Sequence, residues 1–234
     1  SRLDGIITIN PEVSDWYSAN TRIKKVIDFP IIRKEETYIN KLKEVRNISN
    51  EYIHTFSLEN KKILGFVGRL TPVKNLGKLI EVFGNIPQEK KKGVTILFVG
   101  NGELEQSLKE KVNTPGLNGN IIFTGRYESN ELLAWYPIID TLILPSYSEA
   151  FGAVTGEALL AGCRGMISKY CGSACLINEK NGIVFDSLDD ANFKKALEYI
   201  IDSAKPTTKA SERPNNMPIN YNNKIKALTT FLND

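Results

Sequence analysis

The chain has 234 residues, 41% of them hydrophobic and 24% charged, a composition typical of a globular protein with room for one large domain or two small ones. Its formal net charge of +3 is too small to predict nucleic acid as a partner. No apolar run approaches the roughly 18 residues of a membrane span. Because the sequence opens SRLDG, without an initiator Met or a signal pattern, we expect a piece of a longer chain.

Cysteine and histidine usage argues against two further classes of site. Three cysteines, Cys163, Cys171 and Cys175, form an odd number that suits a reducing compartment better than a disulfide framework. The single histidine, His54, is far from them in sequence, so a metal site is not expected. It also lacks a neighbouring partner for nucleophilic catalysis, which favours a place on a helix surface or in packing.

The first sixty residues differ from the rest. Residues 4–17 predict a strand followed by a short helix, and residues 23–30 predict a second strand closed by proline. Residues 35–56 form a charged stretch with helical character.

From about residue 62 the chain alternates short β-rich runs with helical patterns. The expected strands are 63–68, 94–100, 120–125, 140–145, 164–169 and 182–186. The expected helices are 75–86, 103–113, 129–136, 154–162 and 190–203. The strand runs are continuously apolar, as in strands covered on both faces. This repetition predicts the α/β class with a doubly wound parallel sheet, in which ligands bind beyond the carboxyl ends of the strands.

The chain then changes character. Residues 204–218, rich in Pro, Thr, Ser and Asn, predict an extended surface crossing, and residues 219–232 predict a final helix with Ile225, Leu228 and Leu232 on one face. That helix carries too few basic residues to favour a membrane-surface role. The run KKK at 90–92 predicts a solvated loop.

The loop after the first repeat strand carries two cations. Arg69 follows Gly68 at the end of the strand, and Lys74 precedes the next helix. An Arg and a Lys beside a helix N-terminus, with its partial positive charge, could bind a dianionic group. The alternative is an arginine that packs a turn and a solvated lysine.

The loop after the second strand, GNGELE, resembles a dinucleotide fingerprint only superficially. Glu105 occupies the third glycine position, and Glu103 would repel a pyrophosphate, so NAD binding is not expected. Gly100 and Gly102 are expected to let the backbone turn tightly beside a ligand or a neighbouring loop.

The third strand ends in Gly125, Arg126 and Tyr127. The exposed backbone there could bind a base edge, and Arg126 or Tyr127 could cover a ring face; an ordinary loop is the alternative. Ser129 is expected to cap the helix that follows.

The stretch LPSYSEAFGAVTGEALLAG follows the fourth strand. The backbone amides of Ala150, Phe151 and Gly152 could point at an anion. Glu157, about one turn inside the next helix, could accept hydrogen bonds from a vicinal diol such as ribose, and Glu149 could face sugar hydroxyls or an anomeric centre. In the alternative, Glu149 is a turn residue and Glu157 a helix surface charge.

Together these motifs resemble those of a known family. The chain combines G68-R69-L70-x-x-x-K74, G100-N101-G102-x-L104, F123-x-G125 and P145-S146-x-x-E149-x7-E157. This set resembles the Rossmann-like donor-binding domain, the C-terminal half, of retaining GT-B glycosyltransferases with the glutamate-x7-glutamate motif, often called family 4. The resemblance covers roughly residues 60–203.

The resemblance implies roles for these residues. Arg69 and Lys74 would bind the donor diphosphate, Glu157 the ribose hydroxyls, and Glu149 with the 150–152 amides the transferred sugar and the β-phosphate. Residues around Arg126 would meet the base. No metal or other cofactor is implied, and the pair Asp189-Asp190 is expected to cap a helix.

The chain departs from the family at two places. Where relatives often carry a glycine pair it has Gly172-Ser173, and most of the acceptor-side domain, with its glycine-rich loop and histidine, is missing. The resemblance implies a remnant of that domain and linker at 1–31, a nucleotide-sugar-binding domain at 32–203, and a crossover tail with a final helix at 204–234.

We therefore expect a glycosyltransferase that transfers a sugar, with retention, from a UDP- or GDP-sugar to a glycan or lipid-linked oligosaccharide. Such enzymes serve capsule, lipopolysaccharide or exopolysaccharide synthesis in the bacterial cytoplasm, with possible peripheral contact with the inner membrane. We expect the isolated chain to be inactive, and apolar groups around Ile6, Ile7, Trp16 and the last helix to be exposed. The alternatives are a non-catalytic nucleotide-binding module and a GT-B nucleotide-sugar epimerase.

Overall fold

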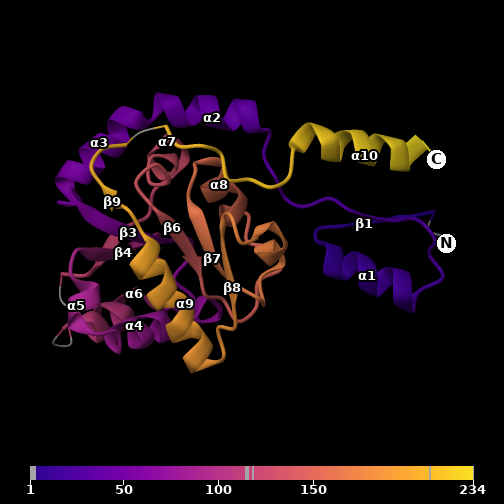
Figure 1. Ribbon diagram of the computed structural model, residues 1–234. Coiled ribbons are helices and arrows are strands. Elements are labelled where there is room, and N and C mark those ends of the chain that lie inside the picture. Colours follow the sequence, from indigo (N-terminus) through magenta and orange to yellow (C-terminus); the bar gives the residue numbers. More distant parts are fainter. Residues whose placement is uncertain (1–3, 114–115, 118, 211, 234) are drawn as a thin grey trace.

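The computed structural model describes residues 4–113, 116–117, 119–210 and 212–233. The chain forms a main body built around a large sheet, and a smaller part in which the first and last described elements lie side by side (Figure 1).

The main sheet has seven strands in the order β5-β4-β3-β6-β7-β8, with β9 paired to β3 outside this path. All pairings along the path are parallel, and only β9 is antiparallel. The strands are β3 (Lys61–Val67), β4 (Val94–Val99), β5 (Ile121–Gly125), β6 (Thr141–Leu144), β7 (Arg164–Ser168), β8 (Gly182–Phe185) and β9 (Pro206–Thr207). The expected doubly wound α/β sheet is confirmed.

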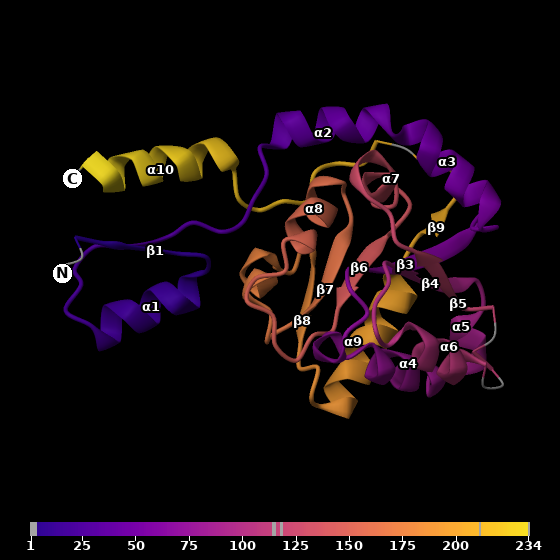
Figure 2. The same cartoon turned by 180° about the vertical axis from the view of Figure 1, so that it is seen from behind.

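Helices cover both faces of this sheet, as Figures 1 and 2 show. One face carries α4 (Leu76–Gly84), α5 (Gln88–Lys91), α6 (Glu105–Val112) and α9 (Asp190–Ser203). The other carries α2 (Glu35–Glu44), α3 (Arg46–Thr55), α7 (Ser129–Leu133) and α8 (Val154–Leu160). Every residue of β4 and β6 is buried, which explains their unbroken apolar sequences.

The local signals in the sequence account for most boundaries. All the expected strands are present within two residues of their expected ends, and α9 spans the expected 190–203. Asp189 caps α9 by accepting hydrogen bonds from the amides of Ala191 and Asn192. The helical stretch at 35–56 divides into α2 and α3 at Val45, which is buried.

One expectation about an exposed segment was wrong and another was incomplete. Lys91, expected in a solvated loop, is buried in α5, where its amino group donates to the Gly84 carbonyl at 3.1 Å and lies over the Phe83 ring. The tail is more than a surface crossing: β9 joins the sheet, and Arg213 donates to the carbonyls of Ile139 and Tyr136. Residue 211 lies outside the described residues.

The smaller part contains β1 (Ile6–Thr8), α1 (Pro11–Asn20) and β2 (Val26–Asp28), with β1 and β2 paired in parallel. The expected final helix, α10 (Tyr221–Asn233), packs against it: Lys224 pairs with Asp28 at 2.5 Å. Ile7 and Trp16 are 50% and 57% exposed, as expected, whereas Ile6 is half-buried. None of the described helices is long and apolar enough to cross a membrane.

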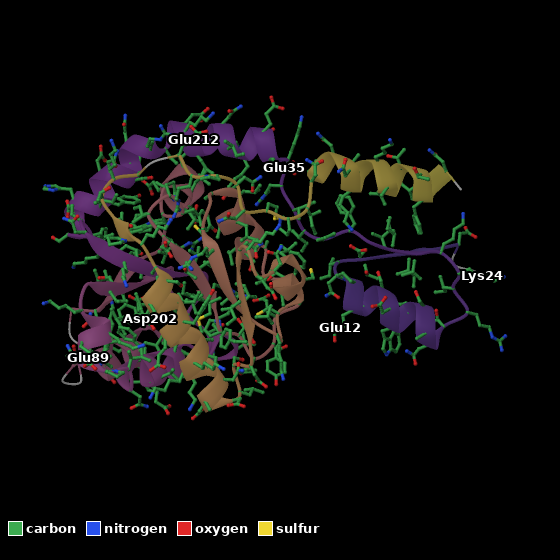
Figure 3. The ribbon with its side chains drawn as sticks, viewed as in Figure 1. Glu12, Lys24, Glu35, Glu89, Asp202 and Glu212 are labelled. Carbon is green, nitrogen blue, oxygen red and sulfur yellow. The ribbon has the colours of Figure 1, made fainter. Side chains whose placement is uncertain are left out.

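Two chain crossings join the smaller part to the main body. Near them the amide of Tyr221, at the start of α10, donates to the Glu35 carboxylate at 2.7 Å. Figure 3 shows Glu35 where α2 and α10 approach each other, and Glu212 where the tail passes α2. Glu212 pairs there with Lys43 and Arg46, both at 3.5 Å.

Candidate functional site

The loops that follow the central strands are bonded to one another at the carboxyl end of the sheet. The amide of Gly68 donates to the Val99 carbonyl at 3.0 Å, and the amide of Leu70 donates to the Asn101 carbonyl at 2.9 Å. The next loop joins them, since the amide of Gly100 donates to the Gly125 carbonyl at 2.8 Å. The loops after β3, β4 and β5 therefore form one rigid rim.

Close backbone contact explains two glycines in this rim. A Cβ atom on Gly100 would lie 2.0 Å from the Gly68 carbonyl oxygen, and one on Gly102 would lie 2.5 Å from the Leu70 carbonyl oxygen. Of the two roles expected for these glycines, the structure favours packing against a neighbouring loop. Their effect on a ligand would be indirect, through the position of Arg69 between the two contacts.

Lys74 and Glu149 meet across the rim. Lys74 ends a short 3-10 turn, Pro72–Lys74, and the left-handed Asn75 (φ 56°) then redirects the chain into α4. The Lys74 ammonium forms an ion pair with the Glu149 carboxylate, and both side chains are largely buried. The amide of Tyr147 donates to the Val73 carbonyl at 3.1 Å, which ties the same two loops by their backbones.

Unpaired donors lie in the same two loops. Arg69 is exposed, and its guanidinium forms no hydrogen bond or ion pair with any described residue. The amides of Ala150, Phe151 and Gly152 likewise donate to none of the described residues. A cation and three amides without protein acceptors can bind an anion at no cost in existing bonds.

The pair Gly172-Ser173, which stands where related proteins often carry two glycines, packs against the 150–152 loop. A Cβ atom on Gly172 would lie 2.2 Å from the Ala150 carbonyl oxygen, so a glycine is required there. Ser173 is buried, and its hydroxyl bonds the Thr155 hydroxyl at 2.8 Å while its amide donates to the Phe151 carbonyl. Ser173 therefore holds the 150–152 loop in place through its bonds to Phe151 and Thr155.

Glu157 lies in α8 and is bonded from two sides. Its Oε2 accepts a hydrogen bond from the Tyr136 hydroxyl at 2.8 Å, and its Oε1 accepts from Arg33 Nη2 at 2.7 Å and Arg33 Nε at 3.2 Å. Burial, followed by the charge of Glu157, raises the pKa of Tyr136, so this hydroxyl remains a donor. The bond to Glu157 and its charge raise the pKa of Arg33.

A pocket of about 480 Å³ opens beside Glu157, between α2, α7 and α8. It is lined by Arg33, Lys34, Thr37, Tyr38, Lys41, Ser129, Asn130, Leu132, Leu133, Tyr136 and Glu157. Lys34 and Lys41 pair with no carboxylate among the described residues. Arg69, Lys74 and Glu149 are not part of this lining. The structure thus brings Lys74 to Glu149 directly, and places Glu157 with Arg33 and Tyr136 instead.

One expectation for the third loop was wrong, the capping role of Ser129. The Tyr127 ring packs 5.3 Å from Tyr52 and 5.4 Å from Trp135, between centroids, and Arg126 pairs with Glu128 at the surface. Ser129 does not cap α7: Glu128 holds the cap position without a side-chain bond, and Ser129 begins the helix with a φ of 50°. Ser129 faces the pocket instead.

The remaining reactive groups do not form a site. Burial raises the pKa of the Cys171 thiol to about 12 and that of Cys163 to about 11, so neither is a thiolate near neutral pH. His54 is 91% exposed on α3, which confirms the expectation for it. The described residues contain no group of His, Cys, Asp and Glu that could hold a metal ion.

Most residues that line the Glu157 pocket were not expected from the sequence, among them Arg33, Tyr38 and Tyr136. A usable signal existed for α2, because positions 34, 37, 38 and 41 recur at helical spacing and so share one face. The Tyr136 contact had no such signal, since it depends on how the segment after α7 lies against α8.

The sequence model described as "Glycosyl transferases group 1" matches residues 50–217. An uncharacterised glycosyltransferase of Methanocaldococcus jannaschii is 27% identical over 208 residues, which cover 86% of this chain and 50% of the relative. The Escherichia coli lipopolysaccharide glucosyltransferase WaaG is 30% identical over 124 residues, 53% of this chain and 32% of the relative.

Solved structures agree on the fold. The Anabaena protein Alr3699/HepE, determined in complex with UDP and glucose, superposes with a TM-score of 0.72 at 16% identity, over 98% of this chain and 63% of that one. WaaG superposes with a TM-score of 0.66 at 20% identity, over 84% of this chain and 53% of that one. The chain spans about half the length of the proteins that it matches.

Proposed function

Because the chain belongs to the glycosyl transferases group 1 family, we propose that it is the donor-binding half of a retaining, family 4 glycosyltransferase that uses a UDP- or GDP-linked sugar. The observation that carries the proposal is the cluster of unpaired donors, Arg69 and the amides of 150–152, beside the Lys74–Glu149 pair. This arrangement suits a pyrophosphate, whose oxygens would be the missing acceptors. The solved relative bound to UDP supports the donor class by analogy only.

In the proposed reaction the acceptor hydroxyl attacks the anomeric carbon on the face from which the diphosphate leaves. The bond from the anomeric carbon to the phosphate oxygen breaks, the bond to the acceptor oxygen forms, and the acceptor proton passes to the leaving phosphate oxygen. Negative charge grows on the diphosphate, so Arg69, Lys74 and the 150–152 amides would stabilise the transition state more than the ground state.

The two glutamates would flank this group. Glu149, already held by Lys74, would face the transferred sugar, and that lysine would bridge the carboxylate to the departing phosphate. Glu157 would accept hydrogen bonds from the ribose hydroxyls. Arg126 would lie near the base, whereas the ring of Tyr127 would support the loop through its contacts with Tyr52 and Trp135.

The wider assignment follows from the same proposal. Residues 1–31 would belong to the acceptor-side domain and linker, 32–203 to the donor domain, and 204–234 to the crossover. The acceptor would be a glycan or lipid-linked oligosaccharide in envelope polysaccharide synthesis at the cytoplasmic face of the inner membrane. Without the acceptor domain, the chain would bind the donor nucleotide but not transfer the sugar.

Titration calorimetry with UDP, GDP, ADP and NAD tests the donor class on this chain. We expect UDP or GDP to bind, and Arg69→Ala or Lys74→Ala to abolish binding. In an enzyme that carries both halves, either change should lower the rate on the order of 10²–10³-fold, the scale of a lost oxyanion donor. Lys92→Ala, at the amino end of β4, is the matched control and should change neither property. Binding of NAD alone, or unchanged affinity in both variants, would refute the assignment.

A further inference from the structure

Glu157 accepts hydrogen bonds from one buried partner and one exposed partner. The Tyr136 hydroxyl that bonds Oε2 belongs to a side chain that is only 1% exposed, so no solvent or ligand can replace it. Arg33, which bonds Oε1, has a side chain that is 62% exposed, while that of Glu157 is 15% exposed. An ion pair with one partner largely in water contributes little free energy, so a ligand can compete for Oε1 but not for Oε2.

The pocket beside Glu157 contains a polar group that lacks a partner. The hydroxyl of Tyr38 is buried and makes no hydrogen bond within the described part of the chain, and its side chain lines the same pocket. Buried hydroxyls are rarely left unsatisfied, and such a group often indicates a missing ligand or water. The pocket thus holds a hydroxyl without a partner in the same lining as the carboxylate that Arg33 bonds.

We propose that Arg33 is an exchangeable counter-ion that holds Oε1 of Glu157 until the hydroxyls of a nucleoside diphosphate displace it, and that Tyr136 is the positioning residue that keeps Oε2 fixed throughout. This inference rests on the proposed function, which assigns the ribose to Glu157. It adds that Arg33, which precedes α2, competes with the donor and lowers its affinity.

Whether removal of Arg33 tightens or weakens nucleotide binding distinguishes competition for Glu157 from a general effect of positive charge. If Arg33 only contributed positive charge to the pocket, then its removal would weaken the binding of an anionic nucleotide. If Arg33 competes for Glu157, its removal tightens binding, because the nucleotide no longer breaks an ion pair. The neighbouring Lys34 lines the same pocket without a carboxylate partner, so it provides a matched control.

The test is calorimetry of UDP and GDP with the complete 234-residue chain, wild type, R33Q and K34Q. We expect R33Q to bind about two- to fivefold more tightly than wild type, the range of an exposed ion pair. K34Q should bind equally or more weakly. The advantage of R33Q should shrink at high salt, which screens the ion pair in the wild type. Weaker or unchanged binding by R33Q would overturn the inference for Arg33.

The role of Tyr136 has its own readout, the preference for UDP over 2′-deoxy-UDP. If Tyr136 holds Oε2 in place, affinity should depend on the ribose 2′-hydroxyl. We therefore expect the wild type to bind UDP more tightly than 2′-deoxy-UDP, and Tyr136→Phe to lose most of that preference. A merely structural role would weaken both nucleotides equally and would overturn the assignment. If wild type and R33Q both fail to bind UDP and GDP, the proposed function itself fails; if the wild type binds and only these variant effects are absent, this inference alone fails.

Discussion

At the scale of single residues, the two tyrosines of the Glu157 pocket differ in a way that only the coordinates show. Tyr136 and Tyr38 are both buried, and burial raises the pKa of each, so both remain neutral. The Tyr136 hydroxyl has a carboxylate acceptor, whereas the Tyr38 hydroxyl has none among the described residues. Removal of the Tyr38 hydroxyl should therefore raise stability, and removal of the Tyr136 hydroxyl should lower it.

We expect Tyr38→Phe to stabilise the ligand-free protein by about 1 kcal/mol, because an unsatisfied buried hydroxyl costs roughly 1–3 kcal/mol. For a chain of this size this corresponds to a rise in Tm of about 2–4 °C. Tyr136→Phe, the matched variant, should destabilise by about 1.5–3 kcal/mol through loss of a bond to a charged group. Thermal unfolding of both proteins measures the difference, and a fall in Tm for Tyr38→Phe would contradict the assignment.

The elements of the main sheet were predictable because their signals are local. Continuous apolar runs marked β3 to β8, and Asp189 marked the start of α9. The errors arose where packing decides. Lys91 is buried because its amino group packs against Gly84 and Phe83 at the end of α4, while α5 packs on α9. β9 forms only because Pro206 reaches β3. Neither contact leaves a periodic pattern in the sequence.

For the candidate site, the placement of the loops was predictable and the side-chain contacts between them were not. The loops with Arg69, Lys74 and Glu149 follow parallel strands, so the topology alone brings them to one edge. The direct Lys74–Glu149 pair and the diversion of Glu157 toward Arg33 could not be predicted, since they depend on side-chain geometry between segments far apart in the sequence.

The rim of loops makes a prediction at the scale of elements. In Gly102→Ala, the added Cβ would lie 2.5 Å from the Leu70 carbonyl oxygen, so the loop that carries Arg69 must move. We expect a loss of about 1–3 kcal/mol in stability and at least tenfold weaker UDP or GDP binding. In Gly119→Ala, the control, φ is 85° and the added Cβ would have no atom of a described, non-neighbouring residue within 4 Å. Only stability should therefore fall, by roughly 1–2 kcal/mol. Equal nucleotide affinities in the two variants would show that the rim does not position Arg69.

At the scale of the whole molecule, the smaller part depends on α10. A helix of 13 residues is marginal by itself in water, so its order must come from packing. Phe231 supplies that packing, because the Cζ of its ring lies 2.8 Å from the position of a Cβ on Gly5. The contact joins α10 to the residue that precedes β1.

We expect Phe231→Ala to raise amide hydrogen exchange in α10 and in β1–β2 by about tenfold or more, while β3 to β8 stay protected. Leu232→Ala, at the next position and 65% exposed, should leave exchange unchanged. Uniform loss of protection across the main sheet would mean that the two parts unfold together, contrary to this prediction.

The paired crossings between the two parts have a mechanical consequence. A part joined by one connecting segment could rotate about that segment. The smaller part is joined at 29–34 and again at 214–220, so it cannot rotate without stretching one of the two crossings. Because the Lys224–Asp28 ion pair links α10 to β2, the two crossings must bend together. Any opening or closing of the smaller part over the loops of the sheet is thereby confined to a hinge-like swing, and a fluorophore on α10 would follow it.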